Sequence, residues 1–253
     1  MTKVIRTIED WQEERAALEA GGLSLGFVPT MGALHAGHRA LLEQARAEND
    51  RVVLSIFVNP TQFDDPNDLR QYPRTLNTDV KFAQATTDYV LYPEPAEIYP
   101  DGFRYRVNEH SSSEDLEGVH RPGHFEGVLT VVLKLLNLVG PRRAYFGEKD
   151  WQQLQLVQGM ARAFFLPVEI VACPTVREED GLAMSSRNRR LSPEARARAP
   201  TFPRILREAA NADRAVRDLV AAGFGVDYVE DREGRRLAAV RLEKIRLIDN
   251  VRI

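Results

Sequence analysis

The regular alternation of short apolar runs with helix-type patterns is the feature that most constrains the fold of this chain. The runs Leu23–Pro29 and Arg51–Val58 are rich in apolar and β-branched residues, as is typical of buried parallel strands. Helical spacing follows the first run, from about His38 to Asn49. Strands that alternate with helices pair in parallel through right-handed crossovers. The sequence therefore predicts a doubly wound α/β domain over roughly residues 1–174.

The same alternation predicts further elements of this domain. We expect helices at Thr78–Ala85, Phe125–Val139 and Asp150–Phe165, and strands at Asp88–Tyr92, Ala144–Phe146 and Val168–Ala172. Gly140 and Pro141 are expected to end the second of these helices.

Residues 175–253 differ in character and are expected to form a small α+β domain. They are richer in arginine, and they contain a helical stretch at Ser192–Ala222. Two β-like stretches follow, Gly225–Val229 and Leu237–Arg246, separated by the turn-prone EDREG. In open α/β sheets, ligands bind at the carboxyl ends of the strands. We therefore expect a ligand site at that edge of the sheet, facing the small domain.

Composition excludes several classes of function. The chain has 253 residues and a net charge of −3, which disfavours binding along a nucleic-acid backbone. Its single cysteine, Cys173, excludes an intramolecular disulfide and any multi-cysteine metal site. The first residues are polar, unlike a secretory signal, and the longest apolar run, Val128–Val139, is too short to span a membrane. We expect a cytoplasmic protein that binds neither membranes nor nucleic acids.

The strongest local motif is PTMGALHAGH, at Pro29–His38, where a predicted strand leads into a helix. A helix N-terminus there offers N–H groups and a positive dipole end to phosphates. His35 and His38 are three residues apart, so both imidazoles could donate hydrogen bonds to charge that develops on a phosphate. Alternatively, one histidine caps the helix and the other fills the core. A zinc site would need further ligands at suitable spacing, and the sequence does not connect the other histidines to this pair.

Two other motifs carry groups that suit phosphate. The loop Met184–Asn188 (MSSRN) has two hydroxyls and a guanidinium, although polar loops are often only solvated. In Phe146–Asp150 (FGEKD), Lys149 could neutralise the α- or β-phosphate of a nucleotide. Glu148 or Asp150 could hold a magnesium ion through water. The alternative is an exposed turn with an internal ion pair.

Together these motifs resemble those of a known superfamily. The HAGH and MSSR segments are similar to the "HIGH" and "KMSKS" signatures of adenylyl-transferring enzymes, which include class I aminoacyl-tRNA synthetases and small nucleotidyltransferases. Arg187 here replaces the usual final lysine. Six ordered blocks narrow the resemblance to the pantoate–β-alanine ligase family: Pro29–His38, Ser55–Phe63, Tyr72–Thr75, Arg121–Asn137, Phe146–Leu154 and Val176–Asn188.

The resemblance implies a reaction and an architecture. ATP, pantoate and β-alanine would give pantothenate, AMP and pyrophosphate through a pantoyl adenylate. It also implies a Rossmann-like domain at 1–174 that binds ATP and pantoate, a C-terminal lid domain at 175–253, dependence on Mg²⁺, and a homodimer. The C-terminal part is expected to be shorter than is usual in the family.

The resemblance also assigns roles to individual residues. His38, His35 and Lys149 would be catalytic, and Gln62 and Gln153 would bind pantoate or β-alanine. Arg121 and Tyr72 are further candidates for the wall of the site, and no metal ligand is assigned. ATP would be bound by Met31, Gly32, Ala33, Leu34, His35, Ala36, Gly37, His38, Gly147, Glu148, Lys149, Asp150, Val176, Met184, Ser185, Ser186 and Arg187.

Two other functions remain as alternatives. A related nucleotidyltransferase would transfer AMP to a phosphate acceptor and stop there, but the glutamines of NPTQF and DWQQL suit a neutral or carboxylate substrate. A non-catalytic nucleotide-binding homologue would be expected to have lost a histidine or the SSR loop, and this chain keeps both. A tRNA synthetase is disfavoured, because an anticodon-binding domain is missing and the net charge is weak.

Overall fold

The computed structural model describes residues 2–253, and these form two compact units. The first unit comprises residues up to Leu34, His38–Gly147 and Gln152–Cys173. The second comprises Pro174–Ile253 together with two short segments, His35–Gly37 and Glu148–Trp151. The main division therefore lies between Cys173 and Pro174, next to the boundary expected from sequence.

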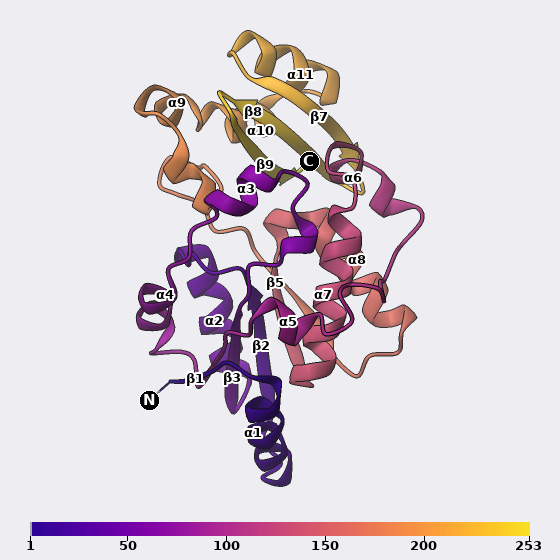
Figure 1. The fold of residues 1–253 in the computed structure, drawn as a ribbon. Coiled ribbons are helices and arrows are strands. Elements are labelled where there is room, and N and C mark those ends of the chain that lie inside the picture. The colour runs from indigo at the N-terminus through magenta and orange to yellow at the C-terminus, as the bar shows by residue number, and fades with distance from the viewer. Residues whose placement is uncertain (1) are drawn as a thin grey trace. The chain divides into compact units, whose positions relative to one another are not determined.

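The first unit is built on a parallel sheet of six strands in the order β1-β4-β3-β2-β5-β6 (Figure 1). The predicted doubly wound sheet is confirmed. The strands are β1 (Lys3–Ile5), β2 (Leu25–Thr30), β3 (Arg51–Ile56), β4 (Tyr89–Leu91), β5 (Arg143–Gly147) and β6 (Glu169–Cys173).

The strand order reverses between β2 and β5. From β2 the chain adds β3 and β4 in one direction, and it then returns to place β5 on the other side of β2. These two strands pair in parallel, with Gly26 opposite Arg143 and Phe27 opposite Ala144. Their carboxyl ends therefore flank the switch point where open α/β sheets bind ligands. The motifs PTMGALHAGH and FGEKD both begin at these ends.

Helices connect the strands of this sheet. They are α1 (Ile8–Ala20), α2 (Ala36–Glu48), α3 (Pro66–Gln71), α4 (Leu76–Ala83), α5 (Pro95–Ile98), α6 (Glu117–His120), α7 (His124–Val139) and α8 (Trp151–Ala163). Single 3₁₀ turns lie at Pro60–Gln62, Ser112–Glu114 and Glu148–Asp150. The elements predicted between residues 23 and 172 are present within a few residues. β1 and α1 were not predicted, because β1 is short and α1 buries only Trp11 and Leu18.

Helix α7 is deeply buried, since eleven of its sixteen residues are inaccessible to solvent or nearly so. Left-handed glycines flank it: Gly123 (φ 79°) precedes it and Gly140 (φ 60°) follows it. The N–H of Gly140 donates to the Leu136 carbonyl, which confirms the predicted end of the helix. The core of the sheet includes the buried Val28, Leu54, Val90 and Tyr145.

The second unit contains a three-stranded antiparallel sheet, coloured yellow in Figure 1. Its strands are β7 (Gly225–Arg232), β8 (Arg235–Leu242) and β9 (Ile245–Arg252), and its helices are α9 (Pro193–Arg198), α10 (Thr201–Glu208) and α11 (Ala212–Ala221). Phe202, Leu206, Leu219 and Val240 are fully buried in its core. This is the predicted small α+β domain.

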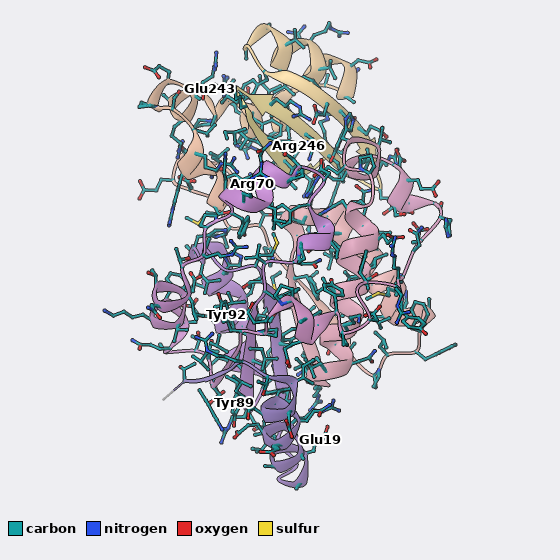
Figure 2. The ribbon with its side chains drawn as sticks, in the orientation of Figure 1. Glu19, Arg70, Tyr89, Tyr92, Glu243 and Arg246 are labelled. Carbon is teal, nitrogen blue, oxygen red and sulfur yellow. The ribbon has the colours of Figure 1, made fainter. Side chains whose placement is uncertain are left out.

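One predicted stretch of this unit proves to be two strands. Leu237–Arg246 contains the end of β8, a tight turn and the start of β9. Figure 2 labels Glu243 at this turn and Arg246 on β9. Glu243 adopts φ 55°, a conformation that glycine usually takes in such turns. Because glutamate stands there instead, the sequence did not indicate a turn at this position. Within residues 2–253, no helix has the length and hydropathy that crossing a bilayer requires.

Candidate active site

The loop after β2 is held in an unusual conformation by a buried aspartate. Gly32 (φ 82°) and Ala33 (φ 51°) both adopt left-handed backbone angles. The Asp79 carboxylate, 2% exposed, accepts hydrogen bonds from the N–H groups of Ala33 (3.0 Å) and Leu34 (2.9 Å). Thr75 donates to the same carboxylate at 2.9 Å. The backbone N–H groups of Ala33 and Leu34, which precede helix α2 (Ala36–Glu48), are therefore engaged by Asp79.

This loop sets the positions of the two motif histidines. Helix α2 begins at Ala36, so His35 precedes the helix and His38 lies in its first turn. Both side chains are half-buried. A side chain at Gly32 would bring its Cβ within 3.0 Å of the Asp79 carboxylate and of Ile56, in a backbone conformation that already disfavours one. The start of the motif is thus fixed by packing as well as by hydrogen bonds.

Within the second unit, His35 is a neutral hydrogen-bonding group. Burial, and then the charges of Lys149 and Arg189, lower the pKa of His35 to about 4. The Gly37 N–H donates to Nδ1 at 3.2 Å, so the single ring proton of the neutral imidazole lies on Nε2. His35 therefore presents an Nε2–H donor at neutral pH.

The HAG segment lies against the MSSR loop. A Cβ added at Gly37 would meet the His35 ring at 2.9 Å and the Met184 Cβ at 3.8 Å. The contact with Met184 would be an ordinary one, so the residue that an added Cβ would displace is His35 itself. The two signature segments, far apart in sequence, are neighbours inside the second unit.

Lys149 lies on the 3₁₀ turn that follows β5. Its side chain is 19% exposed, and its ammonium lies 3.7 Å from the Asp150 carboxylate. The neighbouring Glu148 is bound to two arginines, with Arg235 at 2.7 Å and Arg252 at 3.8 Å. Of the two carboxylates expected to hold magnesium, Asp150 is 48% exposed and lies near one lysine, whereas Glu148 is 15% exposed and pairs with two arginines. Among residues 2–253, no cluster of three or more His, Cys, Asp or Glu side chains could hold a metal ion.

The loop after β6 is a small, well-connected structure. The Met184 N–H donates to the Val176 carbonyl at 3.0 Å, and Arg177 forms an isolated β-bridge with Ala183. The Ser185 hydroxyl accepts from the Arg187 N–H at 3.2 Å and caps the 3₁₀ turn Ser186–Arg190. Ser185 thus has a structural role, while the side chains of Ser186 and Arg187 are half-buried.

Asn188 closes this loop from inside. It is 6% exposed, and its amide donates to the Glu178 carboxylate at 2.7 Å and to the Ala183 carbonyl at 3.0 Å. Glu178 and Asp180 also bind Arg196 of α9, each at 2.6 Å. The MSSR segment is therefore held at both ends.

In the first unit, Gln62 is oriented by a buried asparagine. Asn59, 1% exposed, donates to the Gln62 Oε1 at 2.9 Å and to the Gly127 carbonyl at 3.2 Å. Its Oδ1 accepts from the Tyr99 hydroxyl at 2.7 Å and from Thr61 at 3.0 Å. Oε1 of Gln62 is thus engaged within the protein, and its amide NH₂ is a donor that would suit a hydroxyl or carboxylate oxygen.

His124 and Arg121 hold the backbone of the same residue. The His124 Nδ1 donates to the Gln62 carbonyl at 2.9 Å, and Arg121 donates to the His124 Nε2 at 3.0 Å. Arg121 also pairs with Glu117 at 3.7 Å and Asp64 at 3.5 Å. Arg121, proposed from sequence as a wall residue, is thus part of the support for Gln62.

Helix α7 approaches the 3₁₀ turn Pro60–Gln62 without intervening side chains. A Cβ added at Gly127 would lie 2.4 Å from the Thr61 carbonyl oxygen, closer than real Cβ atoms come. Gly127 therefore allows α7 to support the segment that carries Gln62.

The two glutamines of DWQQL have different environments. Gln152 donates to the carbonyls of Ser112 (2.6 Å) and Asp115 (2.8 Å) and accepts from the Glu117 N–H (3.0 Å). Gln153 is half-buried in the first turn of α8, in the first unit with Gln62. Tyr72 packs edge-on against Phe63, with ring centroids 5.7 Å apart.

The structure therefore divides the predicted residues into two sets. His35, Ala36, Gly37, Glu148, Lys149, Asp150, Val176, Met184, Ser185, Ser186 and Arg187 belong to the second unit, and Met31, Gly32, Ala33, Leu34, His38, Gln62, Gly147 and Gln153 belong to the first. Sequence reasoning did not identify Asp79, Asn59 or His124 as parts of this arrangement. Asn59 and His124 lie inside quoted motifs, so their positions were available as a signal. Asp79 carries none.

Comparison with known proteins gives the family. The model of the pantoate-beta-alanine ligase family matches residues 3–252. The chain belongs to the pantoate–β-alanine ligase family. It is 54% identical to a pantothenate synthetase of Bdellovibrio bacteriovorus, over 100% of both chains. It is 52% identical to that of Coxiella burnetii strain RSA 331, over 99% of this chain and 97% of the relative.

Solved structures of ligases of this family share the fold. A pantoate-beta-alanine ligase from Francisella tularensis, in complex with beta-gamma ATP and β-alanine, has a TM-score of 0.94 and 39% identity and covers 100% of this chain and 98% of its own. A pantothenate synthetase from Thermus thermophilus has a TM-score of 0.90 and 45% identity, with 99% of each chain covered. These relatives are thus similar to this ligase in length.

Proposed function

We propose that this ligase condenses pantoate with β-alanine through an enzyme-bound pantoyl adenylate, with ATP converted to AMP and pyrophosphate. The observation that carries the proposal is the grouping, within one unit, of the HAG segment, Lys149 and the Met184–Arg187 loop. The cationic side chains of Lys149 and Arg187 and the neutral imidazole of His35 suit a polyphosphate. Membership of the family supplies the substrates.

In the first step the pantoate carboxylate would attack the α-phosphorus of ATP, and pyrophosphate would leave. A carboxylate is already a nucleophile, so the step needs alignment and charge compensation more than a base. Orienting two bound reactants supplies about 7–11 kcal/mol at best. Lys149, Arg187 and the Nε2–H of His35 would stabilise the five-coordinate phosphorus and the leaving pyrophosphate, together with His38 and Ser186.

Magnesium would accompany the nucleotide and neutralise part of its phosphate charge. Among the described residues there is no carboxylate cluster that could form a dedicated metal site. We propose that Asp150 is the side chain through which the protein meets the ion, because its carboxylate is 48% exposed while Glu148 is bound to arginines. The phosphates and water would supply the remaining ligands.

In the second step the β-alanine amine would attack the acyl carbon of the adenylate. The C–N bond forms, the C–O bond to phosphate breaks, and AMP leaves with the bridging oxygen that came from pantoate. The Gln62 amide NH₂, fixed by Asn59, would hold a pantoate oxygen, and Gln153 would assist. The second unit, in the role of the lid domain that the resemblance implies, would shield the adenylate from water.

The test is an assay of the purified chain with Mg·ATP, pantoate labelled with heavy oxygen in its carboxylate, and β-alanine. We expect pantothenate, pyrophosphate and AMP, with one labelled oxygen in each AMP. Release of ADP with label in inorganic phosphate would replace the adenylate with an acyl phosphate. AMP without label would contradict the adenylate even if pantothenate were formed.

We also propose that the ligase is a homodimer, as the resemblance implies. The edge strand β6 supports this, because among residues 2–253 it pairs with β5 alone and is preceded along the chain by the exposed Phe164 (53%) and Phe165 (91%). Light scattering should give twice the mass of one chain, and Phe165→Glu should shift the mass toward one chain. A monomeric parent protein would contradict the dimer, and an undiminished dimer in the variant would exclude this edge.

A further inference from the structure

Two segments that carry the proposed phosphate ligands are both attached to one strand of the second unit. Lys149 lies on the segment Glu148–Trp151, and Arg187 lies in the 3₁₀ turn Ser186–Arg190, in the loop after β6. These segments are well separated in sequence. Each is bonded to neighbouring residues of β9, Asp249 and Asn250, which are 4% and 3% exposed. Neither residue takes part in the chemistry proposed above.

Asn250 binds the backbone of the segment Glu148–Trp151, here called the lysine turn because it carries Lys149. Its amide NH₂ donates to the Glu148 carbonyl at 2.8 Å and to the Lys149 carbonyl at 3.1 Å. Its Oδ1 accepts from Arg235 at 2.6 Å, which fixes the amide in this orientation. A single side chain thus holds two successive carbonyl groups, one of them belonging to Lys149 itself.

Arg235 of β8 binds two side chains of the same turn. It is 7% exposed, and its second guanidinium nitrogen donates to the Glu148 carboxylate at 2.7 Å. The guanidinium also stacks on the Trp151 ring, 3.8 Å from the ring centroid. The turn is therefore bound on both sides of Lys149, through groups other than the ammonium that would meet the phosphate.

Asp249 binds the other segment. Its carboxylate accepts two hydrogen bonds from Arg177, at 2.7 and 3.0 Å. Arg177 also donates to the Asn250 carbonyl at 3.2 Å and forms the β-bridge with Ala183, the residue before Met184. Bidentate arginine–carboxylate pairs are geometrically specific. The base of the MSSR loop is thus tied to the residue adjacent to the one that holds the lysine turn.

We infer that Arg235, Asp249 and Asn250, here called the clamp, are positioning residues for adenylate formation. The inference rests on the proposed function. The clamp sets the distance between Lys149 and the Met184–Arg187 loop before substrates bind. Donors fixed in advance stabilise transition-state charge without reorganisation, and a misplacement of about 1 Å can cost a hundredfold in rate. The clamp should therefore affect the chemical step more than substrate affinity.

The chain supplies a matched control for a purely structural role. Arg236 is the next residue of β8 and is 2% exposed. It pairs with Asp231 at 2.6 Å and donates to the carbonyls of Leu206 and Ala209, at the end of α10. Arg235 and Arg236 are thus neighbouring buried arginines, each paired with a carboxylate. Of the two, Arg235 is the one bonded to the lysine turn.

The experiment compares Asn250→Asp, Arg235→Lys and the control Arg236→Lys. Asn250→Asp keeps the size of the side chain but turns an acceptor toward the two carbonyls. We expect Asn250→Asp and Arg235→Lys to slow single-turnover pyrophosphate formation at saturating Mg·ATP and pantoate at least tenfold, with pantoate affinity changed less than threefold. We expect Arg236→Lys to lower the thermal unfolding temperature to a similar extent and to keep the rate within threefold.

A second measurement does not depend on activity. Amide hydrogen exchange of the peptide covering residues 147–154 should rise at least fivefold in both clamp variants and stay unchanged in Arg236→Lys. Unchanged exchange there, in either folded clamp variant, would overturn the inference, as would an equal loss of rate in Arg236→Lys. If Asn250→Asp does not fold, Arg235→Lys decides. If the parent protein forms no pyrophosphate, the proposed function fails, and the exchange data alone judge whether the clamp holds the turn.

Discussion

Replacement of Asp79 by asparagine tests what holds the loop after β2, which leads into His35 and His38, in its conformation. In the parent protein one carboxylate oxygen accepts from Leu34, and the other accepts from Ala33 and Thr75. Asparagine has one acceptor oxygen, so an NH₂ group must face at least one N–H donor. Hydrogen bonds to a charged group contribute about 1.5–3 kcal/mol, and a buried unsatisfied donor costs about 1–3 kcal/mol. The lost hydrogen bond and the unsatisfied donor are partly the same interaction, so the two energies are not simply added. We therefore expect the free energy of unfolding to fall by about 2–4 kcal/mol.

The loss should leave the protein folded but release the loop. Domains of this size are stable by about 5–15 kcal/mol. Ala33 is held in a left-handed conformation that costs about 1–2 kcal/mol, so the loop should relax when its anchor is weakened. Adenylate formation should therefore fall together with stability.

Urea unfolding followed by circular dichroism measures the change in stability. The control is Asp50→Asn, because Asp50 accepts from the N–H (2.9 Å) and hydroxyl (2.6 Å) of Ser24 at an exposed position where water can replace these bonds. The control should lose clearly less stability than Asp79→Asn. A loss below about 1 kcal/mol for Asp79→Asn, the ordinary contribution of one neutral hydrogen bond, would refute this account of the loop.

Three other predictions concern the proposed site directly. His38→Ala and Lys149→Ala should each slow adenylate formation a hundredfold or more with unfolding midpoints near those of the parent, as expected for lost charge stabilisation; single-turnover rates within threefold would remove these residues from the mechanism. Gln62→Ala and Gln153→Ala should weaken pantoate binding more than ATP binding in calorimetric titrations, and equal weakening of both ligands would indicate a wrong role. The pKa of His35 is about 4 when folded and 6.5 ordinarily, so the unfolded chain binds the proton more tightly and stability is lost as pH falls from about 6.5 through 4. The loss is at most about 3.4 kcal/mol; His35→Gln should reduce the slope of unfolding free energy over this window, and an unchanged slope would contradict the buried neutral imidazole.

Local patterns predicted most of the architecture because they report local physics. Apolar β-branched runs indicated the central strands, and Gly140 correctly indicated the end of α7. The motif histidines and Lys149 were proposed as site residues because a glycine-rich turn and a cation at strand ends suit phosphate, and their roles stay predictions. β1 and α1 were missed, since three residues of strand and a helix with two buried side chains leave almost no periodicity.

The residues that support the site could not be predicted in the same way. Asp79 binds N–H groups some forty-five residues earlier in the chain, and Asn250 binds carbonyls about a hundred residues away. Both act on backbone groups, which carry no side-chain identity for a motif to record. Their sequence surroundings are those of an ordinary amphipathic helix and an ordinary strand, so only the folded structure shows what they hold.

The close approach of α7 to the 3₁₀ turn Pro60–Gln62 limits which residues around Gln62 can be mutated to test its proposed role. A mutagenesis library aimed at the Gln62 region would naturally include Gly127, but any side chain there meets the Thr61 carbonyl at 2.4 Å. Variants at that position would lose the support of Gln62 before they tested a new substrate. Gly159 of α8 offers the opposite case, because an added Cβ there meets nothing within 4 Å. Alanine at Gly159 would favour the helix by roughly 0.5–1 kcal/mol and offset mutations made elsewhere.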